Sequence, residues 1–115
     1  MKENVIKTKS FNFAVDIVMI YKELAYKQKE YVMSRQLLKS GTSIGANVRE
    51  AEFAQSKPDF TNKMSISLKE ANETVYWIDL LHATGFIDNN TFNKYKIKAE
   101  EILKLLVSIV KTSKQ

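Results

Sequence analysis

Apolar residues recur at intervals of three and four along most of the chain, the spacing that places side chains on one face of an α-helix. Four such series can be followed. They are Phe11, Ala14, Val18, Tyr21, Ala25; Leu37, Gly41, Ile44, Val48, Ala51; Phe60, Met64, Leu68, Ala71, Val75, Ile78, His82; and Phe92, Tyr95, Ala99, Ile102, Leu106, Ile109. The pattern predicts four helices, over about residues 10–27, 31–55, 58–84 and 89–112.

Polar residues between these series supply signals for helix ends. Ser10 is a candidate N-cap for the first helix. For the third helix, Pro58 suits the first turn, and Ser56 or Asp59 suits the cap and first turn. Gly85 offers a C-terminal stop, and Asp88 offers the cap of the fourth helix. We expect the segments before and after the bundle, residues 1–7 and 112–115, to fray.

The second series contains a run of small residues, Ser40 to Ala46. Each glycine costs a helix about 1 kcal/mol relative to alanine. The run could therefore be a loop between two short helices. Alternatively, Gly41 and Gly45 lie on one face of a single helix and let a neighbour approach closely. The apolar spacing continues unbroken through both glycines, which favours a single helix.

Short connections between successive helices make neighbours antiparallel. The chain has 115 residues, which suits one domain, and only 3 Gly and 1 Pro, too few for the many tight turns of an all-β protein. The predicted fold is all-α, an antiparallel up-and-down four-helix bundle formed by residues 1–115.

The composition excludes several kinds of site. There is no Cys and only 1 His, which rules out disulfides, a thiol nucleophile and a two-histidine metal site. Asp79 and His82 have the carboxylate–histidine spacing of di-iron bundles, but no second histidine completes such a site. We therefore expect no enzymatic activity, no cofactor and no metal.

The sequence gives no sign of export or of membrane insertion. The N-terminus lacks the apolar stretch of a signal peptide, and Asp16 and Lys104 interrupt the apolar runs well below the roughly 20 residues that span a bilayer. We expect a soluble, cytoplasmic protein with no membrane partner.

Some apolar residues lie off the predicted core stripes. They are Phe13 and Ile20 on the first helix and Ile66, Trp77 and Leu80 on the third. Apolar residues at helical spacing outside a core stripe indicate a second buried face, most simply a contact between subunits. The other interpretation is a broad core stripe with Trp77 half exposed.

Polar residues next to the stripes suggest a seam between the second and third helices. Its candidate members are Ser40, Ser43, Asn47 and Glu50 on one helix and Glu70 and Glu73 on the other. Buried polar residues must be paired, and pairing would fix the register of the two helices. The alternative is a binding or catalytic cleft lined by the three carboxylates.

The net charge is +5, which favours nucleic acid or an acidic protein as partner. The alternative is a solvated, lysine-rich surface without such a partner. Arg35, Lys39 and Arg49 have helical spacing and can lie along one side of the second helix. Lys94 and Lys98 would extend this face if the fourth helix adjoins it. In the rival arrangement, Arg49 pairs internally with Glu52 or Glu73.

Two segments carry a resemblance to a known family. Arg35 to Ala51, which includes Ser43-Ile44 and Asn47-Val48-Arg49-Glu50, is similar to the signature of four-helix bundle proteins encoded in intervening sequences of bacterial 23S rRNA genes. Lys63 to Trp77 resembles the third helix of the same family. The likeness extends over nearly the whole chain.

The resemblance implies a four-helix bundle that assembles as a ring, a homopentamer. Related accessory proteins of diversity-generating retroelements bind nucleic acid and a reverse transcriptase. Together with the basic charge, this gives our leading hypothesis, a non-enzymatic oligomer that binds nucleic acid, specifically RNA. The alternative is a scaffold that docks an acidic protein and binds no nucleic acid.

Overall fold

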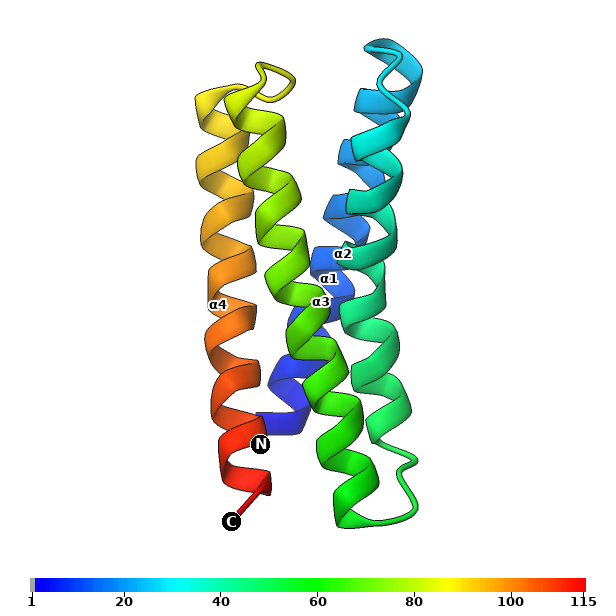
Figure 1. Cartoon of the computed structure of the whole chain (residues 1–115), viewed down its shortest axis with the longest axis vertical. Helices are drawn as coiled ribbons and strands as arrows, with labels where there is room; N and C mark the ends of the chain where they lie inside the picture. Colours follow the sequence, from blue (N-terminus) through cyan, green and yellow to red (C-terminus); the bar gives the residue numbers. More distant parts are fainter. Residues whose placement is uncertain (1) are drawn as a thin grey trace.

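The computed structural model describes residues 2–115, which form four α-helices and one π-helical turn. The elements are α1 Lys2–Lys22, η1 Glu23–Lys27, α2 Val32–Ala51, α3 Lys57–Ala83 and α4 Asn89–Ser113. Successive helices run in opposite directions along the 44 Å long axis of the molecule (Figure 1). The predicted antiparallel four-helix bundle is confirmed.

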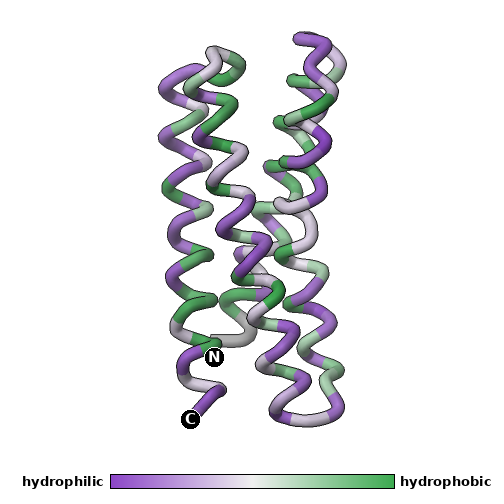
Figure 2. The backbone as a smooth tube through the Cα atoms, viewed as in Figure 1, coloured by the Kyte–Doolittle hydropathy of each residue, from purple (hydrophilic) through white to green (hydrophobic). Residues whose placement is uncertain are grey.

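The order of packing decides which faces can adjoin. Helix α2 packs along α1 on one side and along α3 on the other, and α4 packs along α3 and less extensively on α1. Helices α2 and α4 therefore occupy opposite corners of the bundle. Apolar and polar residues alternate along every helix (Figure 2), and the apolar ones turn toward the shared core.

The core stripe of α1 differs from the predicted one. Phe11, expected in the core, is 55% exposed, whereas Phe13 is 2% exposed and Ile17 is fully buried. Both faces of this helix carry apolar residues at helical spacing, so periodicity alone could not decide between them. The neighbouring helix decides, because α2 offers a glycine, Gly41, against Ile17.

The start of α1 also differs from the prediction. The helix is already formed at Lys2, and Ser10 lies inside it, buried, with its hydroxyl donating to the carbonyl of Lys7 at 3.2 Å. Residues 2–7 are helical rather than frayed, and Ile6 is fully buried in the core. Met1 lies outside the described residues.

The caps expected for the last two helices are present. The hydroxyl of Ser56 accepts the backbone N–H of Asp59 at 3.2 Å, and the carboxylate of Asp88 accepts that of Thr91 at 2.8 Å. This bond lowers the pKa of Asp88 because it favours the charged form. Gly85 adopts φ +85° just after α3, a conformation that other residues rarely take.

The small-residue run of α2 is part of one continuous helix. A Cβ atom on Gly41 would lie 2.8 Å from both Cγ atoms of Ile17, and one on Gly45 would lie 3.3 Å from the carbonyl oxygen of Ser10. The two glycines therefore allow α1 to approach α2 more closely than any side chain would permit.

A buried polar seam joins α2 and α3, and among the expected members only Ser40 takes part in it. The hydroxyls of Ser40 and Thr74 lie 2.9 Å apart, and Ser67 donates to the carbonyl of Ile44 at 2.9 Å. Ser40, Ser67 and Thr74 are each at most 1% exposed. Small hydroxyls make this seam because they can be paired without bringing a charge into the core.

The expected pairing of Asn47 with α3 is not formed. Its side-chain amide donates to the carbonyl of Ser43 at 2.8 Å, within α2. The hydroxyl of Ser43 likewise donates to the carbonyl of Lys39 at 2.6 Å. Both side chains form these hydrogen bonds within their own helix, so the bonds do not set the register of α2 against α3.

We predict that Gly41→Ala lowers the free energy of unfolding by about 1–2 kcal/mol. The added methyl overpacks the stiff, buried Ile17 side chain, and the gain in helix propensity offsets only part of this cost. Denaturant unfolding followed by circular dichroism measures the change. Ala46→Gly, at an exposed position of the same helix, calibrates the propensity term.

Gly41→Ala should have the opposite effect on the free energy of unfolding once Ile17 is shortened. In an Ile17→Ala background the steric conflict is gone, so Gly41→Ala should stabilise by up to about 1 kcal/mol. A Gly41→Ala protein more stable than the wild type would show that close helix approach does not constrain this position.

We predict that Thr74→Val destabilises the fold by about 1–3 kcal/mol, because it removes the hydrogen bond that Thr74 donates to the buried Ser40 hydroxyl and leaves that hydroxyl only its 3.4 Å bond to the carbonyl of Leu37. The double change Ser40→Ala with Thr74→Val should recover most of the loss, since both partners are then apolar. Asn47→Ala serves as the comparison and should cost clearly less. Equal losses from Asn47→Ala and Thr74→Val would contradict the seam described above.

Candidate nucleic-acid interface

The three basic residues predicted on the second helix lie on the exposed side of α2. Among the side chains of residues 5–115, Arg35, Lys39 and Arg49 form no ion pair with any carboxylate. The rival interpretation required an ion pair of Arg49 with Glu52 or Glu73, and neither pair is formed. Its guanidinium carbon lies 6.0 Å from the ring centroid of Phe11, across the groove between α1 and α2.

The two lysines of the fourth helix do not extend this face. Lys98 pairs with Asp16 of α1 at 2.8 Å, and the Lys94 ammonium lies 5.4 Å from the centroid of the Tyr95 ring. Because α4 occupies the corner opposite α2, Lys94 and Lys98 belong to a separate surface. Burial, followed by the charge of Asp16, raises the pKa of Tyr95 there.

Carboxylates of α3 border one edge of the basic face. Glu70 and Glu73 lie on the flank of α3 that is turned toward α2, and the charge of Lys39 acts on Glu70. Partial burial, followed by the charge of Glu73, raises the pKa of Glu70 above its ordinary value. A phosphate near Lys39 therefore meets some repulsion, whereas Arg35 lies farther around the helix toward α1.

The carboxylates do not converge on a cleft of the kind that acid–base chemistry needs. Glu50 is exposed beside the α1–α2 groove, and the carboxylate of Glu73 accepts a long hydrogen bond from the Trp77 indole at 3.4 Å. His82 is hydrogen-bonded to Asn89 at 2.8 Å and stacks on Phe92, which holds the α3–α4 end together. Residues 2–115 contain no group of three carboxylates or histidines placed to hold a metal ion.

The apolar residues predicted at a subunit contact are mostly covered within the chain. Ile20 is buried in the core, and this prediction is wrong because the α1 core stripe includes it. Ile66, Trp77 and Leu80 are half-buried, and Trp77 packs against the core cluster. These three residues leave only part of their surface for a partner.

Exposed apolar surface is concentrated instead on the outer face of α1. Phe11, Val15 and Met19 follow one another at intervals of four and are all exposed. We call them the α1 outer stripe. Phe53, just after α2, is 79% exposed and lies across the α1–α2 groove from Phe11. The spacing of four between Phe11 and Val15 in the sequence indicates this stripe, but the core series predicted for the first helix included Phe11.

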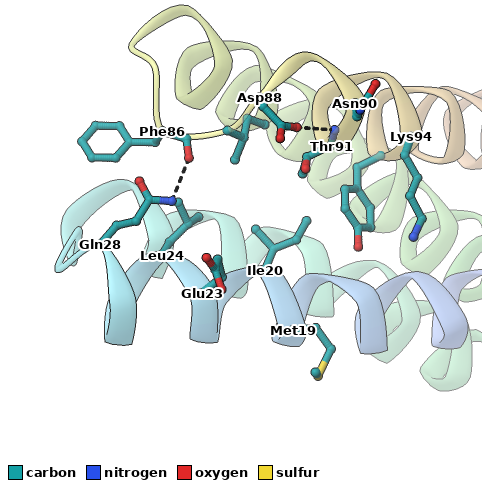
Figure 3. A pocket seen from close by; sticks show the side chains of 12 residues that line it. Met19, Ile20, Glu23, Leu24, Gln28, Phe86, Asp88, Asn90, Thr91 and Lys94 are labelled. Carbon is teal, nitrogen blue, oxygen red and sulfur yellow. Dashed lines mark hydrogen bonds between the residues drawn. The ribbon is translucent and has the colours of Figure 1, made fainter.

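Two shallow grooves accompany these surfaces. The α1–α2 groove measures about 480 Å³ and is lined by Phe11, Phe53 and small residues of both helices, with Arg49 at its rim. The second, of about 400 Å³, lies between the end of α1 and the start of α4 (Figure 3). There the Gln28 amide donates to the carbonyl of Phe86 at 2.9 Å and ties the two ends together.

No helix in the described part of the chain is both long and apolar enough to span a membrane.

Comparison with known proteins supplies the family. The family described as "23S rRNA-intervening sequence protein" matches residues 2–108. A crystal structure from Bacteroides thetaiotaomicron, of a protein with unknown function from the S23 ribosomal protein family, is 58% identical and superimposes with a TM-score of 0.94. The match covers 96% of this chain and 99% of that one. No curated protein matches. The chain therefore belongs to the 23S rRNA-intervening sequence protein family.

Proposed function

We propose that this protein is a non-enzymatic, self-associating bundle that binds RNA through the exposed basic side of α2. The observation that carries the proposal is the contrast in charge pairing. Some lysines of the other helices are held by carboxylates, as in Lys9 with Glu101 and Lys98 with Asp16, whereas none of the three cations of α2 forms an ion pair with the side chains of residues 5–115.

Unpaired cations on one helix face suit a phosphate backbone. Each phosphate contact releases counterions, so a row of free cations gives sequence-independent affinity without any deep pocket. Arg35 and Arg49 add a planar fork that can hold two phosphate oxygens at once and can stack on an unpaired base. The absence of a converging acid–base or metal cluster in residues 2–115 fits binding better than catalysis.

Self-association supports the same function. The α1 outer stripe gives the chain an apolar face that a second copy can cover, and burial of such side chains favours assembly. A closed ring, the homopentamer that the family resemblance implies, would repeat the α2 face in every subunit. Individually weak RNA contacts would then add through multivalency.

For RNA binding, we predict that wild-type protein binds a single-stranded RNA of about 20 nucleotides with a steep salt dependence. Each phosphate contact contributes a slope of about −0.7 to the plot of log affinity against log salt. Arg35→Ala with Lys39→Ala should therefore flatten the slope by about 1–1.5 per engaged subunit. Fluorescence anisotropy at several salt concentrations measures it.

The matched control removes the same charge from α4. Lys94→Ala with Lys98→Ala should leave the slope nearly unchanged, since these residues lie on a different surface. No binding by the wild type at low salt would overturn the proposal. An acidic protein that co-purifies and stays bound at high salt would favour the scaffold function instead.

For assembly, we predict a mass several times the 13.2 kDa of one chain in light scattering at micromolar concentration. Val15→Glu with Met19→Glu should lower that mass, because two charges would be buried without partners in the contact. Ile97→Glu, at an isolated exposed position of α4, is the control and should leave the mass unchanged. A wild-type protein that is a clean monomer would rule out self-association.

A further inference from the structure

We propose that the end of the bundle between α1 and α2 holds unpaired RNA bases against Tyr26 and Tyr31. This tyrosine tip comprises η1 and the connection to α2, residues 23–31, together with the flanking cations Lys22 and Arg35. The inference rests on the proposed RNA binding and adds to it a preference for single-stranded over double-stranded RNA.

The backbone of the tip departs from regular helix in a way that turns its aromatic residues outward. After Lys22 the helix widens into the π-helical turn η1, where the N–H of Gln28 bonds to the carbonyl of Glu23 at 3.2 Å. Lys29 then adopts φ +59°, an uncommon conformation for a residue with a side chain. Single π-helical turns are frequent at functional sites. Here the turn leaves Leu24 and Ala25 buried and the next residue, Tyr26, exposed.

Two tyrosine rings of the tip are available for stacking. Tyr26 is 64% exposed and Tyr31 is 45% exposed, so neither ring is needed to fill the core. The Tyr26 ring rests edge-on against that of Tyr21, with 6.2 Å between centroids, which limits its freedom to reorient. Exposed, partly fixed aromatic rings are the platforms on which proteins stack successive bases of a single strand.

The acidic residues of the tip are already engaged. Glu23 pairs with Lys27 at 3.2 Å. The Glu30 carboxylate accepts the backbone N–H groups of residues 32, 33 and 34, the nearest at 2.7 Å, and so caps the start of α2. Both carboxylates keep their charge, but Lys27 offsets that of Glu23, and the N–H groups at the start of α2 offset part of that of Glu30.

The cations around the rings are not engaged in this way. With the side chains of residues 5–115, Lys22, Lys29 and Arg35 form no ion pair. Tyr31, Arg35 and Lys39 follow at intervals of four, which places them on one side of the start of α2. The tip is therefore continuous with the basic face that we propose for RNA, at the upper end of the α1–α2 pair in Figure 1.

Unpaired RNA fits this combination better than a duplex does. A duplex keeps its bases stacked inside and offers mainly its backbone, whereas loops and single strands can place bases on aromatic rings while cations hold the phosphates. An acidic peptide would use the cations but would not depend on the planar rings in the same way. The preference for unpaired bases is thus the property that identifies this partner.

The test compares Tyr26→Ala with Tyr31→Ala in one chain against wild type, using labelled 20-nucleotide oligouridine and oligoadenosine and a blunt RNA duplex of equal length. Stacking energies measured by alanine substitution correspond to a loss of at least about tenfold in affinity for the single strands. The salt slope should not change, since the rings carry no charge. Duplex affinity should change little.

Two further variants separate stacking from loss of structure. Tyr26→Phe with Tyr31→Phe keeps both rings and should retain near wild-type affinity. Tyr76→Ala removes a tyrosine that is 58% exposed on α3, away from the tip, and should have no effect. Thermal unfolding by circular dichroism should be close to wild type for every variant, because the altered rings of the tip lie largely outside the core.

The outcomes distinguish a failure of base stacking at the tyrosine tip from a failure of RNA binding. Suppose that Tyr26→Ala with Tyr31→Ala keeps full single-strand affinity while Arg35→Ala with Lys39→Ala still flattens the slope. This result would overturn base stacking at the tyrosine tip and leave RNA binding by α2 in place. Equal losses for single strand and duplex also overturn it. Binding of the wild type to anionic vesicles that is lost with the tyrosines, with RNA affinity unchanged, would assign the tip to a membrane surface and overturn it. If the wild type binds no RNA at low salt, both proposals fail.

Discussion

The close approach of α1 to α2 at two glycines decides how the rest of the molecule is arranged. Gly41 leaves just enough room for Ile17, and Gly45 leaves room for the backbone at Ser10. Once Ile17 is seated there, the rotation of α1 about its axis is fixed, and Phe13 turns inward while Phe11 turns outward. The same contact orients α2, whose basic residues then face solvent. A single packing constraint thus generates both the apolar stripe of one helix and the basic face of its neighbour.

Charge pairing then separates the surfaces of the bundle. The contacts of α4 with α1 and α3 are bridged by ion pairs, Lys98 with Asp16 and Lys96 with Asp79 among them. Exposed pairs of this kind contribute little to stability, but they cancel the local field. The cations of α2 have no such partners among the described side chains, and Glu70 and Glu73 border them on the α3 flank. Arg35, Lys39 and Arg49 therefore keep their charge on the exposed side of α2.

Much of this could be predicted from sequence, and the exceptions have physical causes. Helical periodicity and the capping residues Ser56 and Asp88 depend only on local sequence. The order of the helices and the starts of α3 and α4 could therefore be predicted. Ser10 misled because serine serves equally well as a cap or as a small buried residue in a tight helix contact, and only the neighbouring Gly45 decides which. Likewise Asn47 and Ser40 lie on the same side of α2. The Asn47 amide bonds only within α2, whereas the buried Ser40 hydroxyl also accepts a hydrogen bond from Thr74 of α3, and this difference depends on where α3 lies. Which residues of a helix are buried or paired depends on the neighbouring helix, and the residue spacing within the first helix does not show it.

The proposed assembly and the proposed RNA contacts meet at Arg49. Its guanidinium lies over Phe11 of the α1 outer stripe, so a second copy that covers this stripe would also remove water from around Arg49. A desolvated guanidinium interacts more strongly with a phosphate than one in bulk water, because the local dielectric is lower. It also becomes costly to leave without an anion. Arg35, near the tip, is not placed beside the stripe and would act alike in monomer and oligomer. Within these proposals, assembly therefore changes the character of one end of the basic face and leaves the other end as it is in the single chain.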